Sequence, residues 1–189
     1  SSIYDVKVTG SNNCFDTSQI NITVNQLPNV FAGNDQDVCF NDTAQISASG
    51  ANSYQWLPNV NISSTTNSNI NAWPTDTLSY ILTGTDNNQC VNSDTITINI
   101  LDLPNADAGS NLWICPGSSI QLNATGGINY NWSPDSTLNS GALQNPIATP
   151  VDDETYVVTV IDLNNCINYD TVLLEVEPNV PTDAGGDTL

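Results

Sequence analysis

The chain has 189 residues, with 20 acidic side chains, one basic side chain and no histidine, so its formal net charge is −19. Binding to nucleic acid or to an anionic membrane surface requires many Lys and Arg side chains, and this composition excludes both. The absence of histidine excludes a histidine general base and a histidine-ligated zinc site.

The composition is that of a folded chain rather than an acidic tail. Hydrophobic residues make up 39% of the sequence, which is enough to build small cores. No apolar run approaches the roughly 20 residues of a membrane-spanning helix, so membrane insertion is not expected. The start of the chain does not resemble a signal peptide.

A repeat runs through the whole chain without insertion or deletion, and its period of 76 is the step from Cys14 to Cys90 and again to Cys166. The amino-acid types that recur at this spacing are Cys, Tyr, Trp, Gly and Pro. The other matched positions are Tyr4, Tyr80 and Tyr156; Gly33, Gly109 and Gly185; Cys39 and Cys115; Trp56 and Trp132; Pro28 and Pro104; and Pro58 and Pro134.

The period divides the chain into four parts. Residues 1–27 are the C-terminal part of one repeat, residues 28–103 and 104–179 are complete repeats, and residues 180–189 begin the next repeat. The chain therefore begins and ends within a repeat, which indicates a segment of a longer array. Proline follows each repeat boundary closely and stiffens the connections, because it fixes φ and removes a backbone donor.

The predicted elements are short β-strands, taken here in chain order. Their alternating or β-branched patterns lie at 44–49, 54–56, 80–83, 95–100, 120–125, 130–132, 156–160 and 171–176. Gly, Pro, Asp and Asn punctuate the strands, and no helical periodicity is present. The expected fold class is all-β: tandem 76-residue β-sandwich repeats with six or seven strands each, in which Trp56 and Trp132 belong to the cores.

The cysteines predict a disulfide framework. Each complete repeat holds two cysteines at the same spacing, so the simplest pairing is Cys39 with Cys90 and Cys115 with Cys166. Such a bond would stabilise a small sandwich by roughly 4 kcal/mol in the chain-entropy model. Cys14 has no partner within the sequence. Disulfides indicate an oxidising, extracellular compartment, and the absence of CxxC and His argues against metal binding.

The order of several short motifs carries a family resemblance. In the third part of the chain these are residues 104–109 (PNADAG), 114–117 (ICPG), 120–127 (IQLNATGG), 130–134 (YNWSP), 145–150 (NPIATP), 155–160 (TYVVTV) and 165–166 (NC). This series resembles the Ig-like, PKD-like repeats of large secreted surface proteins of the Bacteroidetes. Residues 28–103 follow the same order more loosely. The WDFGDG-like turn of true PKD repeats is absent.

The resemblance implies a cellular location and a biological role. It implies export by the type IX secretion system and a place in a long surface adhesin, extracellular and attached to the outer membrane of a Gram-negative cell. The family resemblance also makes Asp-Thr and Asp-Ser dipeptides candidate O-glycosylation sites of a glycoprotein. Asp followed by Thr also suits a turn that enters a strand. The candidate carriers are Thr43, Thr77, Thr95, Ser136, Thr171 and Thr188.

Two further groups of residues are candidate ligand sites: acidic pairs and non-repeating tryptophans. Acidic pairs near the repeat junctions, with Asp102 and Asp107 as the candidates, suit a Ca²⁺ ion between domains, although no EF-hand or RTX spacing is present. Solvated surface charge is the alternative.

Trp73 and Trp113 do not recur with the period, so they are candidate contacts for a sugar, a neighbouring repeat or another chain. Filling of the local core is the alternative for both.

The sequence predicts a non-catalytic protein. Neither catalytic residues nor a cofactor are expected in small sandwiches with one Lys and no His. The first functional interpretation is a structural segment of an adhesin stalk or filament, with adjacent repeats and copies of the same chain as partners. The second is a glycan- or ligand-binding accessory module of a secreted protein, which would carry a distinctive surface on one repeat only.

Overall fold

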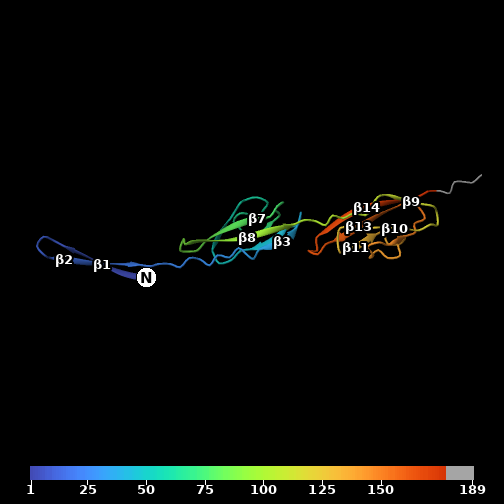
Figure 1. The fold of residues 1–189 in the computed structure, drawn as a ribbon. Helices are drawn as coiled ribbons and strands as arrows, with labels where there is room; N and C mark the ends of the chain where they lie inside the picture. The colour runs from blue at the N-terminus through green and yellow to red at the C-terminus, as the bar shows by residue number, and fades with distance from the viewer. Residues whose placement is uncertain (178–189) are drawn as a thin grey trace, which may run out of the picture. The chain divides into compact units, whose positions relative to one another are not determined.

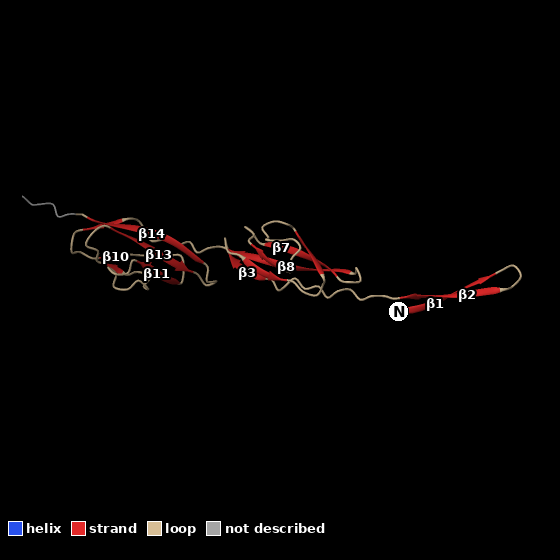
Figure 2. Cartoon of the chain, turned by 180° about the vertical axis from the view of Figure 1, so that it is seen from behind, coloured by secondary structure: helices blue, strands red, loops and turns tan. Residues whose placement is uncertain are grey.

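The computed structural model describes residues 1–177, and these residues form strands and loops without a helix (Figure 1, Figure 2). The chain divides into two compact units, one ending at Asn99 and one beginning at Ile100. This division lies within strand β8 (Val91–Leu101), close to the predicted repeat boundary at 103/104. The predicted repeat start at 180–189, with Gly185 and Thr188, lies outside the described residues. In the described part of the chain, no helix is long and apolar enough to cross a membrane.

Residues 1–27 contribute one antiparallel hairpin, β1 (Ser2–Thr9) with β2 (Phe15–Ile22). Its apolar residues are exposed, for example Tyr4 at 55% and Ile22 at 47%. One period later, Tyr80 and Ile98 are fully buried. The hairpin therefore has the sequence of a core-forming hairpin, while residues 1–27 supply only two of the strands that a complete repeat contains.

Residues 28–103 form a β-sandwich of six strands. The larger sheet has the order β3-β8-β7-β5, and the smaller sheet pairs β4 with β6. The bounds not yet given are β3 (Gln36–Cys39), β4 (Ala44–Ser47), β5 (Ser53–Leu57), β6 (Asn69–Ala72) and β7 (Leu78–Thr85). Alternate residues of each strand point inward, so Trp56, Leu82 and Ile46 meet in the core with almost no exposed surface.

Residues 104–177 repeat this arrangement. The larger sheet is β11-β13-β14-β9 and the smaller one is β10-β12. The bounds are β9 (Leu112–Ile114), β10 (Ile120–Gln121), β11 (Asn129–Ser133), β12 (Ile147–Ala148), β13 (Glu154–Ile161) and β14 (Ile167–Val176). Trp132, Tyr156, Val158 and Leu174 lie in its core, as the sequence predicts for Trp132.

The three hairpins of the chain share one register. Ser2 pairs with Ile22, Leu78 with Ile98, and Glu154 with Leu174. Each pair is displaced from the previous one by one full period of the sequence repeat. The predicted all-β sandwich is therefore confirmed, and the strands follow the sequence period wherever they are described.

Within each sandwich, the hydroxyl group of a buried tyrosine forms a hydrogen bond to another residue of the same sandwich. The Tyr156 hydroxyl lies 2.6 Å from the Thr137 hydroxyl, and the Tyr80 hydroxyl donates to the Val60 carbonyl at 2.9 Å. Burial raises the pKa of both tyrosines above 10.0, because the ionised phenolate loses its hydration. In Tyr156 the Thr137 hydrogen bond lowers the pKa and the charge of Glu154 raises it, both less strongly than burial.

Candidate functional site

The cysteines depart from the predicted pairing. Cys39 and Cys166 are disulfide-bonded, whereas Cys14, Cys90 and Cys115 are free thiols. The predicted intradomain bonds Cys39–Cys90 and Cys115–Cys166 are therefore wrong. The equal spacing of the cysteines suggested a staple within each repeat, but spacing says nothing about where in the sandwich each cysteine lies.

The structure explains why the two cysteines of one repeat do not pair. Cys166 immediately precedes β14, while Cys115 immediately follows Ile114, which lies opposite Val176 at the far end of β14. Ten residues of strand at about 3.3 Å each separate the two ends by roughly 33 Å. A disulfide needs Cα atoms less than about 7 Å apart. The long strand therefore holds the two thiols apart.

Cys166 lies in the hairpin turn at the N-terminal end of its repeat. One carboxylate oxygen of Asp162 accepts hydrogen bonds from the Cys166 and Asn164 amides, both at 2.8 Å. The Asn168 side-chain amide donates to the Pro104 carbonyl at 2.9 Å, which fixes this end of β14 beside the start of the repeat. The side chain that orders the turn thus also orients the cysteine backbone.

Cys90 occupies the same site one period earlier. Asp86 accepts hydrogen bonds from the Cys90 and Asn88 amides at 2.8 Å, and Asn92 donates to the Pro28 carbonyl at 3.0 Å. The turn is built in the same way around a free thiol and around a bonded one. Its geometry therefore comes from the Asp and Asn side chains, without help from a disulfide.

Cys39 and Cys115 lie at the opposite, C-terminal end of their repeats. The Glu177 amide, which follows β14, donates to the Ile114 carbonyl at 2.9 Å, so Cys115 lies where the chain leaves this sandwich. In the preceding repeat, Asn99 near the end of β8 donates to the Asp37 carboxylate at 2.8 Å, two residues before Cys39. Each repeat therefore carries one cysteine at each end.

The aspartates of two Asp-Thr motifs have a structural role. The Asp94 carboxylate accepts a hydrogen bond from the Ala32 amide at 2.8 Å, and the Asp170 carboxylate accepts one from the Ala108 amide at 2.7 Å. In each case the bond joins β8 or β14 to the first residues of its repeat. Both aspartates lie within their strands rather than in a turn that enters a strand, and these hydrogen bonds account for the Asp of the two motifs, whatever the following Thr carries.

The candidate O-glycosylation residues stay a prediction. Thr188 lies outside the described residues, and the other five are all exposed: Thr43, Thr77, Thr95, Ser136 and Thr171. Exposure is necessary for modification of a folded protein but does not demonstrate it. No attached sugar is needed to explain any contact within the sandwiches.

Calcium binding at Asp102 and Asp107 also stays a prediction. Both residues are exposed. The Asp107 carboxylate accepts a hydrogen bond from the Gly109 amide at 2.8 Å, which is the local bond of an Asx turn. Among residues 1–177, no three His, Cys, Asp or Glu side chains are grouped closely enough to hold a metal ion.

The two non-repeating tryptophans are exposed to different degrees. The exposed fraction is 43% for Trp73 and 69% for Trp113. Trp113 lies on the edge strand β9, opposite Glu175 of β14, and Trp73 directly follows β6. Neither side chain belongs to the buried core, so both are available for contacts outside their sandwich.

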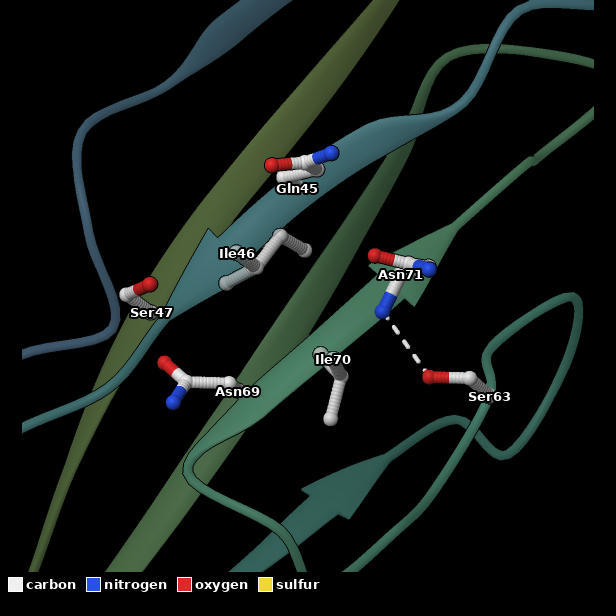
Figure 3. Close-up of a pocket in the computed structure, with 7 residues that line it drawn as sticks. All are labelled: Gln45, Ile46, Ser47, Ser63, Asn69, Ile70 and Asn71. Atoms are coloured by element: carbon white, nitrogen blue, oxygen red, sulfur yellow. Dashed lines mark hydrogen bonds between the residues drawn. The ribbon is translucent and has the colours of Figure 1, made fainter.

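A polar pocket that the sequence did not suggest lies over the smaller sheet of residues 28–103 (Figure 3). Its volume is about 410 Å³. It is lined by Gln45, Ile46, Ser47, Ser63, Asn69, Ile70 and Asn71. The backbone N–H of Asn71 donates to the Ser63 hydroxyl at 2.8 Å. The isoleucines are buried beneath, so amide and hydroxyl groups form the accessible lining.

The pocket lining differs between the two complete repeats. One period later, Gln121 and Asn145 correspond to Gln45 and Asn69, but Ile147 stands where the first repeat has Asn71. Short polar residues spread over two strands and a loop give no periodic signal. Several lining positions do not recur one period later, among them Ser47 (Asn123), Ser63 (Asn139) and Asn71 (Ile147), and these are the sequence features that mark this place.

Comparison with known proteins gives only remote structural likenesses. No protein-family model matches the sequence, and no protein of curated function matches it. Extracellular domains 3–5 of Drosophila OTK share 13% identity, with a TM-score of 0.39 over 93% of this chain and 70% of that one. The insect immune protein hemolin shares 11%, with a TM-score of 0.42 over 93% of this chain and 56% of that one.

The first two immunoglobulin domains of DIP-gamma share 12% identity, with a TM-score of 0.37 over 80% of this chain and 98% of that chain. All three TM-scores are below 0.5. The functional interpretation below therefore rests on the residues of this chain.

Proposed function

We propose that this chain is a non-catalytic structural segment of an extracellular adhesin stalk or filament, built from Ig-like repeats. The observation that carries the proposal is the recurrence of one hairpin, in one register, three times at the spacing of the sequence repeat. A shaft requires many near-equal units, whereas a catalytic or receptor domain requires one distinctive unit.

Charge and redox state support an extracellular place. A net charge of −19 keeps the chain well hydrated and soluble. Disulfide-bonded Cys39 and Cys166 fit an oxidising compartment. Export by the type IX system and attachment to an outer membrane belong to the same proposal and follow from the sequence resemblance. The partners are adjacent repeats and, in a filament, copies of the same chain.

Electron microscopy of cells that produce the protein, with antibody labelling of residues 28–179, tests this proposal. Labelled thin strings or regular fibres at the cell surface are the expected result. Label confined to the cytoplasm, or to compact particles in the medium, would overturn it. Fibres with several chains in cross-section would identify a polymer, and single strings would identify an adhesin stalk.

A glycan-binding module is the second candidate function, and the polar pocket on residues 28–103 favours it. Amide and hydroxyl groups recognise sugar hydroxyls, and Asn71 makes this pocket differ from its counterpart in the next repeat. Glycan-array binding tests the idea. The matched variant is Asn71→Ile, which installs the residue type of Ile147. Trp73→Ala tests the exposed aromatic in the same way. Binding that survives both changes would reject this role for the pocket and for Trp73.

A further inference from the structure

We propose that the first complete repeat binds an uncharged, extended oligosaccharide along the outward face of β6, with Trp73 at one end of the site. The inference rests on the second candidate function, glycan binding, and adds the chemical class of the ligand and the extent of the site. All residues of the site belong to one sandwich, residues 28–103.

Three outward residues form a row on β6 and its continuation. Asn69 and Asn71 are exposed whereas Ile70 and Ala72 are buried, and the alternation continues to Trp73, which is 43% exposed. At about 3.3 Å per residue, the row from Asn69 to Trp73 extends over roughly 13 Å. A Trp ring offers a broad apolar face on which a sugar ring can stack. A row of this length suits a chain of sugars rather than a single one.

The amide side chains beside Trp73 are not used by the sandwich itself. Gln45 lies opposite Asn71 in the register of β4 with β6, and both residues line the same pocket (Figure 3). Gln45 bonds through its backbone carbonyl and Asn71 through its backbone N–H. Among residues 1–177, no hydrogen bond engages the side-chain amide of Gln45, Asn69 or Asn71. These donors and acceptors are available to a ligand.

The second repeat uses the corresponding side chains for its own backbone. The Gln121 side chain donates to the Asn145 carbonyl at 3.2 Å, and the Asn145 side-chain oxygen accepts from the Ala124 amide at 3.3 Å. Gln121 and Asn145 stand one period after Gln45 and Asn69. The same residue types therefore support the backbone in one repeat and stand free in the other, which marks a role specific to the first.

A second polar pocket, of about 480 Å³, extends the site towards the edge strand β5. It shares Asn69 with the first pocket, and its lining includes Tyr54 and Asn67. The Tyr54 hydroxyl donates to the Ala51 carbonyl at 2.9 Å. The Asn67 carbonyl accepts a hydrogen bond from the Trp56 indole N–H, also at 2.9 Å. Both walls are therefore fixed in advance, which lowers the entropic cost of binding.

The absence of charge decides the ligand class. Residues 43–75 contain no charged side chain, and this range includes Trp73 and the whole lining of both pockets. Amide groups both donate and accept hydrogen bonds, as the hydroxyl groups of an uncharged sugar require. A uronate, sulfate or phosphate group would meet no cation in this range and would be repelled by the net charge of −19.

Affinity electrophoresis of the full chain in native gels tests the ligand class, because the acidic protein migrates while an uncharged polymer in the gel does not. The probes are dextran, mannan, xyloglucan and galactomannan, with alginate and polygalacturonate as anionic polymers. We expect retardation by at least one uncharged polymer and by neither anionic one. Retardation by an anionic polymer would overturn this inference and leave glycan binding standing. No retardation by any probe would reject both.

Variants of exposed residues locate the binding. The double change Asn69→Ala with Asn71→Ala, and separately Trp73→Ala, should each weaken binding by about tenfold or more. Asn67→Leu, which installs the residue type of Leu143 in the next repeat, should weaken it as well. Gln121→Ala is the matched control in the second repeat and should leave binding unchanged. Binding that survives the Asn69 and Asn71 double change and Trp73→Ala would overturn the site.

Discussion

Gly126→Ala is expected to destabilise the second sandwich severely. Gly126 has φ of +102°, and a Cβ at this position would lie 2.0 Å from the Asn105 carbonyl oxygen. The backbone would have to separate there. This would break the pair of bonds between Thr125 and Asp107, in which the Thr125 amide donates at 2.9 Å and the Asp107 amide at 3.3 Å.

The magnitude follows from these contacts. Left-handed strain in an alanine costs about 1 kcal/mol, and two lost backbone hydrogen bonds cost about 1 kcal/mol each. The expected loss is about 3 kcal/mol, more than half of the stability of a typical small domain at about 5 kcal/mol. Gly117→Ala is the matched control, because Gly117 has φ of +80° but its Cβ would meet nothing within 4 Å. This change should cost about 1 kcal/mol.

Urea unfolding in reducing buffer, followed by the fluorescence of buried Trp132, measures both variants. At a slope of about 1 kcal/mol per M, the midpoint should fall by about 3 M for Gly126→Ala and about 1 M for Gly117→Ala. The transition reported by Trp56 in the first sandwich is the internal reference and should not move. Equal shifts in the two variants would refute the close approach of residues 105 and 126.

Four further outcomes are expected. Asp170→Ala should lower the unfolding free energy by about 2 kcal/mol, because it leaves the Ala108 amide without its charged acceptor; an unchanged urea midpoint would contradict the role assigned to this carboxylate. Burial raises the folded-state pKa of Tyr156 above its unfolded value of 10.0, so its stabilising effect is complete below pH 10 and is lost as the pH rises through the folded pKa; Tyr156→Phe should flatten the loss of stability above pH 10, and an unchanged pH profile would count against it. Native peptides that carry the five exposed candidate Thr and Ser residues should show added hexose-type masses, and only unmodified masses would end the O-glycosylation hypothesis. If Asp102 and Asp107 bind Ca²⁺, chelator should lower the melting temperature and Asp102→Asn should remove that difference; superimposable melting curves would reject the site.

The sequence predicted the parts of the fold whose signals are periodic. In the hairpin strands, buried residues alternate with more exposed ones over eight or more positions, as in Glu154–Ile161. The sequence pattern therefore predicted both the presence of these strands and the side chains that face the core. Trp56 and Trp132 recur, and both are buried in the cores. The short edge strands escaped prediction. Leu112–Ile114 has only three residues, and neighbours in the sheet rather than its own pattern place it there.

The cysteine pairing could not be predicted from spacing within one repeat. Loop length gives the entropic benefit of a bond but not the distance between its ends, and β14 separates Cys115 from Cys166 along its whole length. The missed signal was the position of each cysteine relative to the strands. Cys166 follows a turn between two long strands, whereas Cys115 follows a short edge strand. The polar pocket was missed for a different reason, because its lining comes from two strands and a loop that share no period.

Single-molecule extension of the fully reduced chain tests the account's central claim, that each complete repeat folds as its own sandwich, most directly. The chain is held at its ends and stretched until both sandwiches unfold. We expect two nearly equal steps, each on the order of 270 Å before the folded length is subtracted, at about 3.6 Å for each of the 76 residues of a repeat. One step of about twice that length, or extension without discrete steps, would contradict the account.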